Sequence, residues 1–427
     1  MTTKDMQCGC PEFTASRRNF LRGMAAVAGA GAITSVNGTA FTQASFAASP
    51  ATTGVAPSIL VMLSLRGGAD GLSLVVPHGD PAYDLARRTI ALPTSALIAS
   101  DEMFGLHPGF APILPMWAAG TLAAVHAVGL PAPNRSHFAA MEAVEDADPG
   151  SAERRGWLNR LVGLDTTASS VEAIQVGAHL IPTALYGPEP VLAIKKIDDM
   201  YLPGRDEPAA RARRVSSLNK VWKNVDGPLG SGARAAVELS NTFENIAGTL
   251  DEPHNGAVYP AGDLGAALAE TARLIRAEMG AEVITIDYGS WDMHAGLGTL
   301  AWGPMQKNVT ELALCIAAFF QDVGTYGTSV TVVTISEFGR RVEENASKGL
   351  DHGYGNVMLL AGAGVNGGRY YGEWPGLAAG NLVDGDLAVT RDYRSVLTEV
   401  VRSRFNADAS RVFPGFSPEP IGVMSAA

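Results

Sequence analysis

The amino-acid sequence predicts an α/β fold in which helices cover both faces of a mostly parallel central sheet. The first observation is a set of continuous apolar runs, such as 58–65, 171–176 and 329–335, each typical of a strand buried on both faces. The second is that these runs alternate with segments whose apolar residues recur at helical spacing. Such strand–helix alternation is typical of parallel sheets covered by helices.

The elements follow one another along the chain. We expect strands over 58–65, 121–128, 171–176, 283–286, 329–335 and 357–360, and helices over 138–144, 264–279, 309–320 and 393–405. Gly280 follows the second of these helices, where glycine is a common C-terminal stop. The segment 198–259 differs because it is polar, charged and interrupted by Pro and Gly. We interpret it as a helical or irregular insertion, or a cap over the site, within one domain over 48–427.

The composition is that of a globular, acidic protein. The chain has 427 residues, of which 47% are hydrophobic and 18% charged, so it can bury a large core. Its formal net charge is −11. Nucleic acids and anionic membranes are therefore not expected as partners, because both require a cationic footprint. The basic residues Arg211, Arg213 and Arg214 are a local exception, which we interpret as a solvated surface.

The first 47 residues read as an export signal. Arg17 and Arg18 are followed by Asn19 and then by two large apolar residues, which is the twin-arginine pattern. The apolar run over 23–33 is too short and too mild for a stable membrane span. We expect recognition by the twin-arginine translocase, cleavage near Ala47, and a location in the periplasm or outside the cell, including the cell surface. The alternative is a surface helix with an accidental arginine pair.

Cleavage there would leave Cys315 as the single cysteine, so no intramolecular disulfide is expected in the mature protein. Such an exported protein must be stabilised by its core or by a bound metal. Export in the folded state allows the metal to be selected and enclosed before the protein changes compartment.

Polar side chains follow several of the expected strands. Because ligands of parallel α/β sheets bind outside the carboxyl ends of the strands, these side chains are expected to lie together. The candidate metal ligands are Asp70, Asp292, His294, Glu337 and His352, the last preceded by Asp351. Carboxylates and imidazoles without thiolates suit Zn²⁺ or Mn²⁺, in one or two ions.

Each candidate also has an ordinary structural interpretation. Asp70 lies among glycines and is a plausible turn residue. Asp292 can form an Asx turn, Glu337 can pair with Arg340 or Arg341, and the pair 351–352 can cap the next element. The joint position of these residues at strand ends favours the metal site over the separate interpretations.

Ser136 is the candidate nucleophile. It opens the helix expected over 138–144, where a serine is most often an N-cap but where free N–H groups can also stabilise an attacking alkoxide. Arg340 is the candidate contact for a substrate anion, with a salt bridge as its alternative. His107 and His126 lie in apolar surroundings and are expected in the core.

Seven motifs occur in an order that resembles a known family. They are Ser16-Arg17-Arg18-Asn19-Phe20-Leu21, Gly67-Gly68-Ala69-Asp70-Gly71-Leu72, Leu106-His107-Pro108, Asn134-Arg135-Ser136-His137-Phe138, Trp291-Asp292-Met293-His294, Ser336-Glu337-Phe338-Gly339-Arg340 and Asp351-His352-Gly353-Tyr354-Gly355. Together they resemble the bacterial domain-of-unknown-function family 1501, which is similar to the alkaline phosphatase and sulfatase superfamily in fold and ligand order.

The resemblance implies an alkaline-phosphatase-like domain and a role for each matching residue. Asp70 would be a metal ligand after the first strand, and Ser136 the nucleophile. Asp292 and His294 would bind one metal, Glu337 the other, and His352 would be the late histidine ligand. Two departures are present: the middle Asp and His are two residues apart instead of four, and Phe338 stands where the superfamily has a histidine. His137, a candidate substrate contact, or Asp351 could complete a second metal site.

The sequence thus favours an exported, metal-dependent hydrolase of phosphate or sulfate esters that acts on a small-molecule or polymer substrate. The alternative is a non-catalytic extracellular binding or surface-assembly protein on a hydrolase-like scaffold.

Overall fold

The computed structural model describes residues 32–37, 40–45, 54–148, 151, 154–164, 171–200, 207–226, 228–246 and 252–426. The arginine pair of the expected export signal, Arg17 and Arg18, lies outside the described residues.

An 11-stranded sheet forms the centre of the molecule, in the order β1-β2-β8-β7-β9-β3-β10-β11-β6-β12, with β13 also paired to β6. The strands are β1 Ala32–Asn37, β2 Ala40–Ser45, β3 Ile59–Leu65, β6 Leu122–Gly129, β7 Ala173–Val176, β8 Leu192–Ile194, β9 Val283–Tyr288, β10 Val330–Ile335, β11 Asn356–Gly362, β12 Tyr370–Tyr371 and β13 Arg391–Asp392. The strands from β8 to β10 are mutually parallel. A second small sheet pairs β4 (Val75–Val76) with β5 (Gly105–Leu106).

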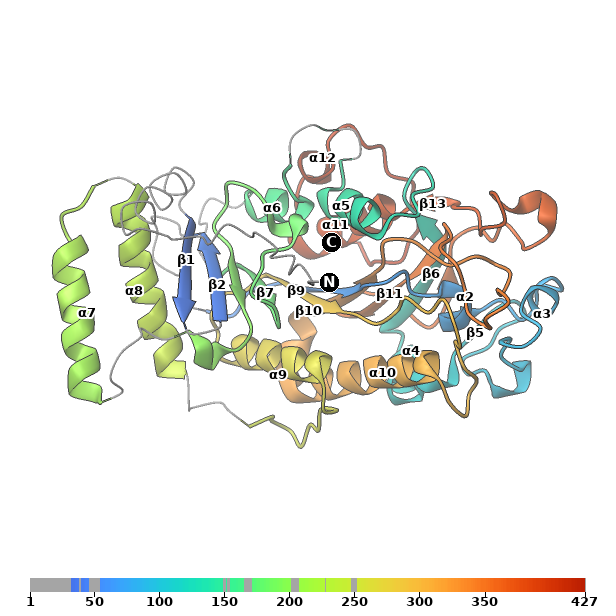
Figure 1. Ribbon diagram of the computed structural model, residues 1–427, viewed down its shortest axis with the longest axis horizontal. Coiled ribbons are helices and arrows are strands. Elements are labelled where there is room, and N and C mark those ends of the chain that lie inside the picture. The colour runs from blue at the N-terminus through green and yellow to red at the C-terminus, as the bar shows by residue number, and fades with distance from the viewer. Residues whose placement is uncertain are drawn as a thin grey trace, which may run out of the picture.

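Helices cover both faces of this sheet (Figure 1). The helices are α2 Gly71–Leu74, α3 Tyr83–Ala86, α4 Leu114–Ala118, α5 His137–Asp146, α6 Trp157–Val162, α7 Pro208–Trp222, α8 Pro228–Ile246, α9 Asp263–Arg276, α10 Pro304–Val323, α11 Tyr393–Phe405 and α12 Ala409–Val412. In Figure 1, α9 and α10 lie below the sheet, and α5, α6, α11 and α12 lie above it. The predicted α/β fold, mostly parallel and covered on both faces, is confirmed.

The central strand β3 shows why its apolar run is continuous. Alternate residues of a strand point to opposite faces. Ile59, Val61 and Leu63 belong to the core shared with α9 and α10, whereas Leu60 and Met62 belong to the core shared with α5 and α11. Because each face is covered by helices, both sets must be apolar.

One expected strand, β11, runs in the opposite direction to the central ones. β11 is antiparallel to β10 and to β6, so the sheet is mixed on this side. An apolar run shows that a strand is buried but carries no information on its direction. The strands β1 and β2 form an antiparallel hairpin within the expected signal segment, and β2 pairs with β8.

The segment expected as an insertion or cap contains two consecutive helices, α7 and α8, which lie side by side in Figure 1. Figure 1 places this pair beyond the β1–β2 side of the sheet, at the opposite end of the molecule from α2. Because α2 directly follows Asp70, α7 and α8 lie away from that residue, and the assignment of the segment as an insertion or a cap stays a prediction. No residue of α7 is buried.

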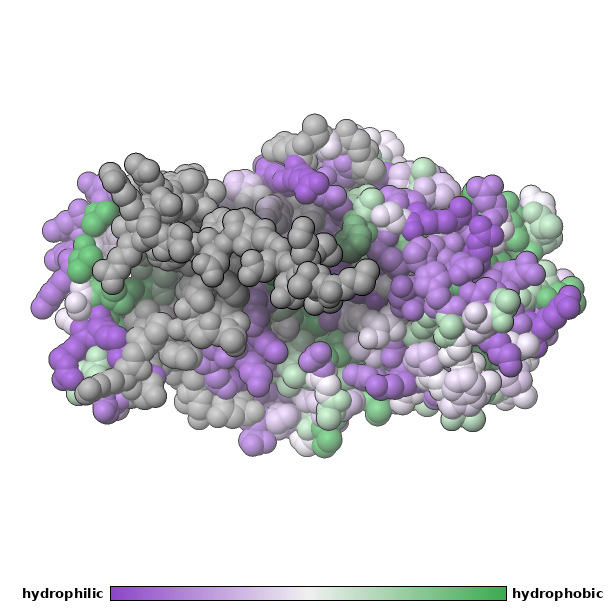
Figure 2. Space-filling view, in the orientation of Figure 1, coloured by the Kyte–Doolittle hydropathy of each residue, from purple (hydrophilic) through white to green (hydrophobic). Residues whose placement is uncertain are grey.

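No helix among the described residues is both long and apolar enough to cross a bilayer. On the face shown in Figure 2, the coloured hydrophobic residues are scattered among hydrophilic ones.

Both histidines expected in the core are buried. His107 accepts a hydrogen bond at Nδ1 from the Gly109 N–H, 2.9 Å away. His126 packs against the rings of Phe104 and Trp374. Burial lowers the pKa of each imidazole to about 4, so both are neutral at neutral pH.

Candidate metal centre

The loops after β3, β9 and β10 meet closely at the carboxyl edge of the parallel strands. A Cβ atom on Gly67 would lie 2.6 Å from the backbone nitrogen of Asp292, and one on Gly68 would lie 2.6 Å from the Phe338 ring. Their φ angles, +111° and +62°, also lie in the region that favours glycine. The two glycines therefore allow three loops to approach within ligand distance of one another.

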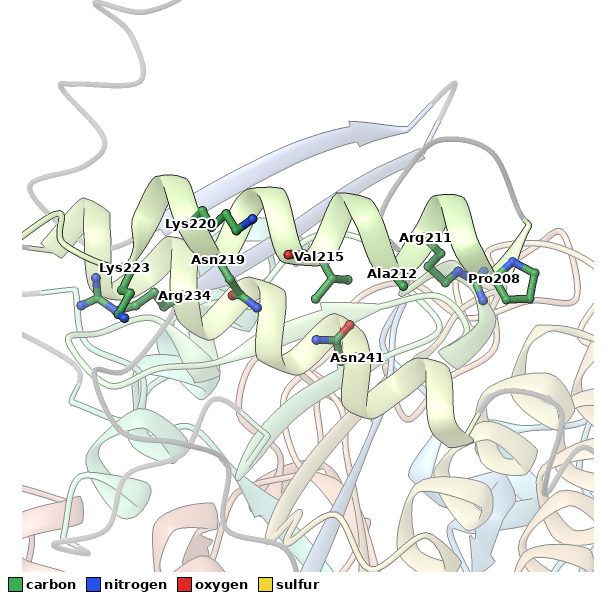
Figure 3. A pocket seen from close by; sticks show the side chains of 10 residues that line it. Pro208, Arg211, Ala212, Val215, Asn219, Lys220, Lys223, Arg234 and Asn241 are labelled. Carbon is green, nitrogen blue, oxygen red and sulfur yellow. The ribbon is translucent and has the colours of Figure 1, made fainter.

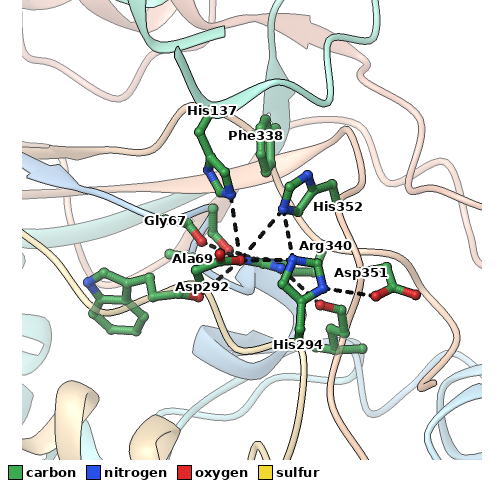
Figure 4. A network of polar contacts seen from close by, with 12 residues as sticks. Gly67, Ala69, His137, Asp292, His294, Phe338, Arg340, Asp351 and His352 are labelled. Atoms are coloured by element: carbon green, nitrogen blue, oxygen red, sulfur yellow. Dashed lines mark hydrogen bonds and ion pairs between the residues drawn. The ribbon is translucent and has the colours of Figure 1, made fainter. Parts of the chain in front are cut away.

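Three imidazoles surround one carboxylate oxygen at this edge (Figure 4). The Oδ1 atom of Asp292 lies 3.5 Å from Nε2 of His137 and 3.5 Å from Nε2 of His352. The ligand atoms of these three residues all lie within 4.8 Å of one another. His294 Nε2 is 3.1 Å from the same Oδ1 and 2.9 Å from His352 Nε2. Ligands bound tetrahedrally at about 2.1 Å from one ion lie roughly 3.4 Å apart, so these spacings suit a shared cation.

The other nitrogen of each imidazole is hydrogen-bonded to an oxygen atom. Nδ1 of His137 lies 2.7 Å from Oε1 of Glu337, and Nδ1 of His294 lies 2.9 Å from Oδ1 of Asp351. Nδ1 of His352 lies 2.8 Å from the carbonyl oxygen of Arg135.

Because carbonyl and ionised carboxylate oxygens only accept, each neutral ring must donate from Nδ1 and carry its lone pair on Nε2. Nε2 of His137 is buried and has no hydrogen-bond partner among the described residues. The Nε2 lone pairs of His137 and His352 thus lie in one group with the Asp292 oxygen, and His294 Nε2 lies beside that group, which suits a metal ion.

The ionisation of these groups also suits metal binding. Burial opposes ionisation of Asp292, but the hydrogen bond and the charge of Arg340, with smaller contributions from His294 and His137, lower the pKa of its carboxyl group. The hydrogen bond from His294 chiefly lowers the pKa of Asp351. Burial chiefly lowers the pKa of His352, against the effect of its bond to the Arg135 carbonyl. Ionised carboxylates and a neutral imidazole are the protonation states of metal ligands.

Asp70 is not part of this cluster. Its Oδ1 atom accepts from Nη2 of Arg87 at 2.8 Å, and its Oδ2 atom is paired with Nη1 of the same guanidinium. Both side chains are buried, and Arg87 also donates from Nε to the carbonyl of Val342 at 3.1 Å. Both oxygens of Asp70 are therefore engaged by an internal cation, and its role as a metal ligand stays a prediction that the geometry does not support.

Glu337 contacts the Nδ1 atom of His137 and does not face the Nε2 atoms that lie around Asp292. Its Oε1 accepts from His137 Nδ1 and, at 2.8 Å, from the Gly67 N–H. Its Oε2 accepts from the Ser336 hydroxyl at 3.0 Å. This buried carboxylate orients the His137 ring.

The guanidinium of Arg340 is buried and surrounded by acceptors. It donates to Asp292 Oδ1 at 2.6 Å and to the carbonyl of Gly68 at 2.6 Å. It also donates to the carbonyls of Leu350 at 2.9 Å and Trp291 at 3.3 Å, and to that of Gly67. These contacts give it a structural role, whereas its role as a contact for a substrate anion stays a prediction.

Ser136 precedes α5 at its N-cap position and is exposed. Its side chain makes no capping hydrogen bond, and its backbone N–H donates to Oδ1 of Asn134 at 3.1 Å. The capping role is therefore not observed, and the nucleophile role stays a prediction. His137, expected as a substrate contact, lies among the ligand atoms.

A groove of about 630 Å³ opens beside the cluster, and the sequence interpretation missed it. His137, Asp292 and Glu337 contribute to its wall, as does one face of α5 that includes Phe138, which is 91% exposed. Arg66 lies at its edge, paired with Glu145 at 2.6 Å and Asp287 at 2.9 Å. The sequence contained a signal for this groove, because Arg66 directly follows the strand expected over 58–65. Asp70, four residues later, was chosen as a candidate on the same ground.

The fold and the cluster define an α/β protein with a candidate metal centre at the carboxyl edge of its sheet. Residues 103–394 match the model of the family described as "Protein of unknown function (DUF1501)", and the chain belongs to that family. The resemblance found in the sequence motifs is thus confirmed. No curated protein matches the chain.

Among solved structures, a phosphonoacetate hydrolase from Sinorhizobium meliloti 1021 in complex with phosphonoacetate is similar over 73% of this chain and 60% of that chain, with 12% identity and a TM-score of 0.27. A phosphonate monoester hydrolase of Agrobacterium radiobacter is similar over 73% of this chain and 70% of that chain, with 11% identity and a TM-score of 0.29. The chain thus spans 60% of the length of the first of these structures.

The pairing of Asp70 with Arg87 leads to a test of its role. Replacing Asp70→Asn leaves a buried guanidinium without its counter-ion, so the free energy of unfolding should fall by about 3–5 kcal/mol in urea titrations. Bound metal, measured by elemental analysis, should be unchanged. The double variant Asp70→Asn/Arg87→Met removes the unpaired charge and should recover part of the loss. Loss of metal without loss of stability would show instead that Asp70 is a ligand.

Proposed function

We propose that this protein is a metal-dependent hydrolase of phosphate or sulfate esters. The observation that carries the proposal is the convergence of three imidazole Nε2 atoms on the Asp292 carboxylate, at the wall of a groove large enough for an organic group.

The residues fit one divalent cation, Zn²⁺ or Mn²⁺, held by Asp292, His137, His352 and His294. The buried Nε2 of His137, which has no hydrogen-bond partner among the described residues, supports this fit. A second cation has no comparable site among the described residues, because Glu337 and Asp70 already bind internal donors. When bound, the cation supplies a Lewis acid for an ester oxygen.

The chain supplies the remaining parts of the mechanism. Glu337, Asp351 and the Arg135 carbonyl keep the three imidazoles in the tautomer that binds a cation. The Ser136 hydroxyl would attack the phosphorus or sulfur atom and lose its proton to solvent, while the bond to the ester oxygen breaks and the alcohol leaves. The first N–H groups of α5 would stabilise the oxyanions. The groove along α5 holds the organic part of a small-molecule or polymer ester.

A second function, non-catalytic binding or surface assembly, is favoured by a different observation. Phe338 packs against both His137 and His352, with ring centroids 4.9 Å and 4.8 Å away, where the superfamily that the motifs resemble has a histidine ligand. In that case the cation would stabilise the loops and perform no chemistry.

We also propose that the protein acts outside the cytoplasm, in the periplasm or at the cell surface, after export by the twin-arginine translocase. The motif around Arg17 and Arg18 supports this location.

The metal proposal is tested by elemental analysis of the purified protein. We expect close to one Zn²⁺ or Mn²⁺ per chain, and a large loss in His352→Gln, which lacks one converging lone pair. Removal by a chelator should lower the melting temperature, because ligand at a hundredfold excess over Kd stabilises by about 2.7 kcal/mol. His254→Gln, which alters an exposed histidine, is the control and should retain the ion. Two ions per chain, or full occupancy in His352→Gln, would contradict the assignment.

The nucleophile is tested with Ser136→Ala. Because the side chain makes no capping bond, this surface change should alter the free energy of unfolding by less than about 0.5 kcal/mol. Turnover of aryl phosphate or aryl sulfate esters should fall by several orders of magnitude. Retained turnover would remove Ser136 from the mechanism. If metal-loaded wild-type protein hydrolyses none of these esters, the binding function becomes the better account.

The export proposal is tested with Arg17→Lys/Arg18→Lys, which keeps the charge and removes the recognised pair. The precursor should accumulate in the cytoplasm, as cell fractionation would show. Normal export of this variant, or export that depends on the general secretory route, would contradict the proposal.

A further inference from the structure

A second groove, of about 950 Å³, runs between α7 and α8 (Figure 3). Its lining includes four cationic side chains and no acidic one. The cationic residues are Arg211, Lys220, Lys223 and Arg234. The groove is therefore a cationic surface with amide and hydroxyl groups between its charges.

The groove contrasts with the charge of the whole chain. Residues 207–246 contain six Lys and Arg residues against four Asp and Glu, whereas the chain has a net charge of −11. Within 208–223 the charged residues are all basic. A cationic surface of this kind in an acidic protein concentrates anions locally.

Three of the four charges that line the groove have no ion-pair partner among the described residues. Among the described residues, no salt bridge is formed by Lys220, Lys223 or Arg234. Arg234 donates from Nη1 to the carbonyls of Trp222 at 2.7 Å and Val225 at 2.9 Å, which holds its charge at the C-terminal end of α7. Like charges held close together repel one another, and a bound anion relieves that repulsion.

We propose that this groove binds an extended anionic polysaccharide. The cationic side chains are spread along the length of α7 and α8 (Figure 3), which suits a linear polyanion. Asn219, Asn241 and Ser216 offer hydrogen bonds to sugar hydroxyl groups, and the cations bind the sulfate, phosphate or carboxylate groups of the polymer. Figure 1 places α7 and α8 at the opposite end of the molecule from α2, which follows the loop that carries Gly67 and Gly68. This groove is therefore separate from the metal centre, and the proposal does not rest on the proposed hydrolase activity.

Binding is measured with fluorescent dextran sulfate at 0.15 M salt, with uncharged dextran as the comparison. We expect dextran sulfate to bind and uncharged dextran not to bind. Lys220→Gln/Lys223→Gln should weaken binding about tenfold or more and reduce the dependence of log Kd on log salt by roughly 1.5, because two ion contacts are lost. Ser216→Glu, at an exposed position of α7, places a carboxylate in the groove and should weaken binding further.

The matched control is Arg88→Gln/Lys307→Gln, which removes two exposed charges away from the groove. Its affinity should stay within twofold of the wild type. An equal loss in the control would show that overall charge, and not the groove, binds the polymer. Absence of wild-type binding to dextran sulfate, or tighter binding to phosphatidylglycerol vesicles than to dextran sulfate, would overturn the proposal.

Discussion

The buried guanidinium of Arg340 connects the loops on which the whole carboxyl edge depends. It donates a hydrogen bond to the carboxylate of Asp292. It also donates to backbone carbonyls in three segments of the chain, which are those of Gly67, Gly68, Trp291 and Leu350. Each buried carbonyl that lost its donor would cost about 1–3 kcal/mol. One side chain thus fixes the loops after β3 and β9 against the loop after β10. The ligand oxygen of Asp292 is positioned by the same contact.

The distribution of fixed charge decides how many cations the centre suits. Arg87 neutralises Asp70, and Arg340 shares the Oδ1 atom of Asp292. Glu337 is engaged by a backbone N–H and by the ring of His137. Arg87 and the ring of His137 therefore engage the two carboxylates that a second cation would need, and one group of His137, Asp292 and His352 remains. The resemblance to a two-metal superfamily is thus only partly matched by the geometry.

Much of the fold follows from the sequence, and less of the site. Burial on both faces gave β3, β9 and β10 strong apolar signals, but β8 and β12 are too short to be recognised without their partners. His294 follows β9 and lies at the expected edge, whereas His352 precedes β11 and reaches the same edge because that strand is antiparallel to β10. The rule that strand ends meet could not reveal that Asp70 pairs with Arg87, 17 residues later, because no periodicity links them. The sequence also cannot show which carbonyls accept hydrogen bonds from Arg340, because every residue has a backbone carbonyl.

The contact between His137 and Glu337 joins residues 200 positions apart in the chain. Closing so long a loop costs conformational entropy, so such contacts form late in folding. Because His352 also contributes, the candidate metal centre can be assembled only after the chain has been synthesised at least as far as that residue. In the function proposed above, metal uptake would therefore follow folding, and export of the folded chain would carry out a protein whose cation had already been selected.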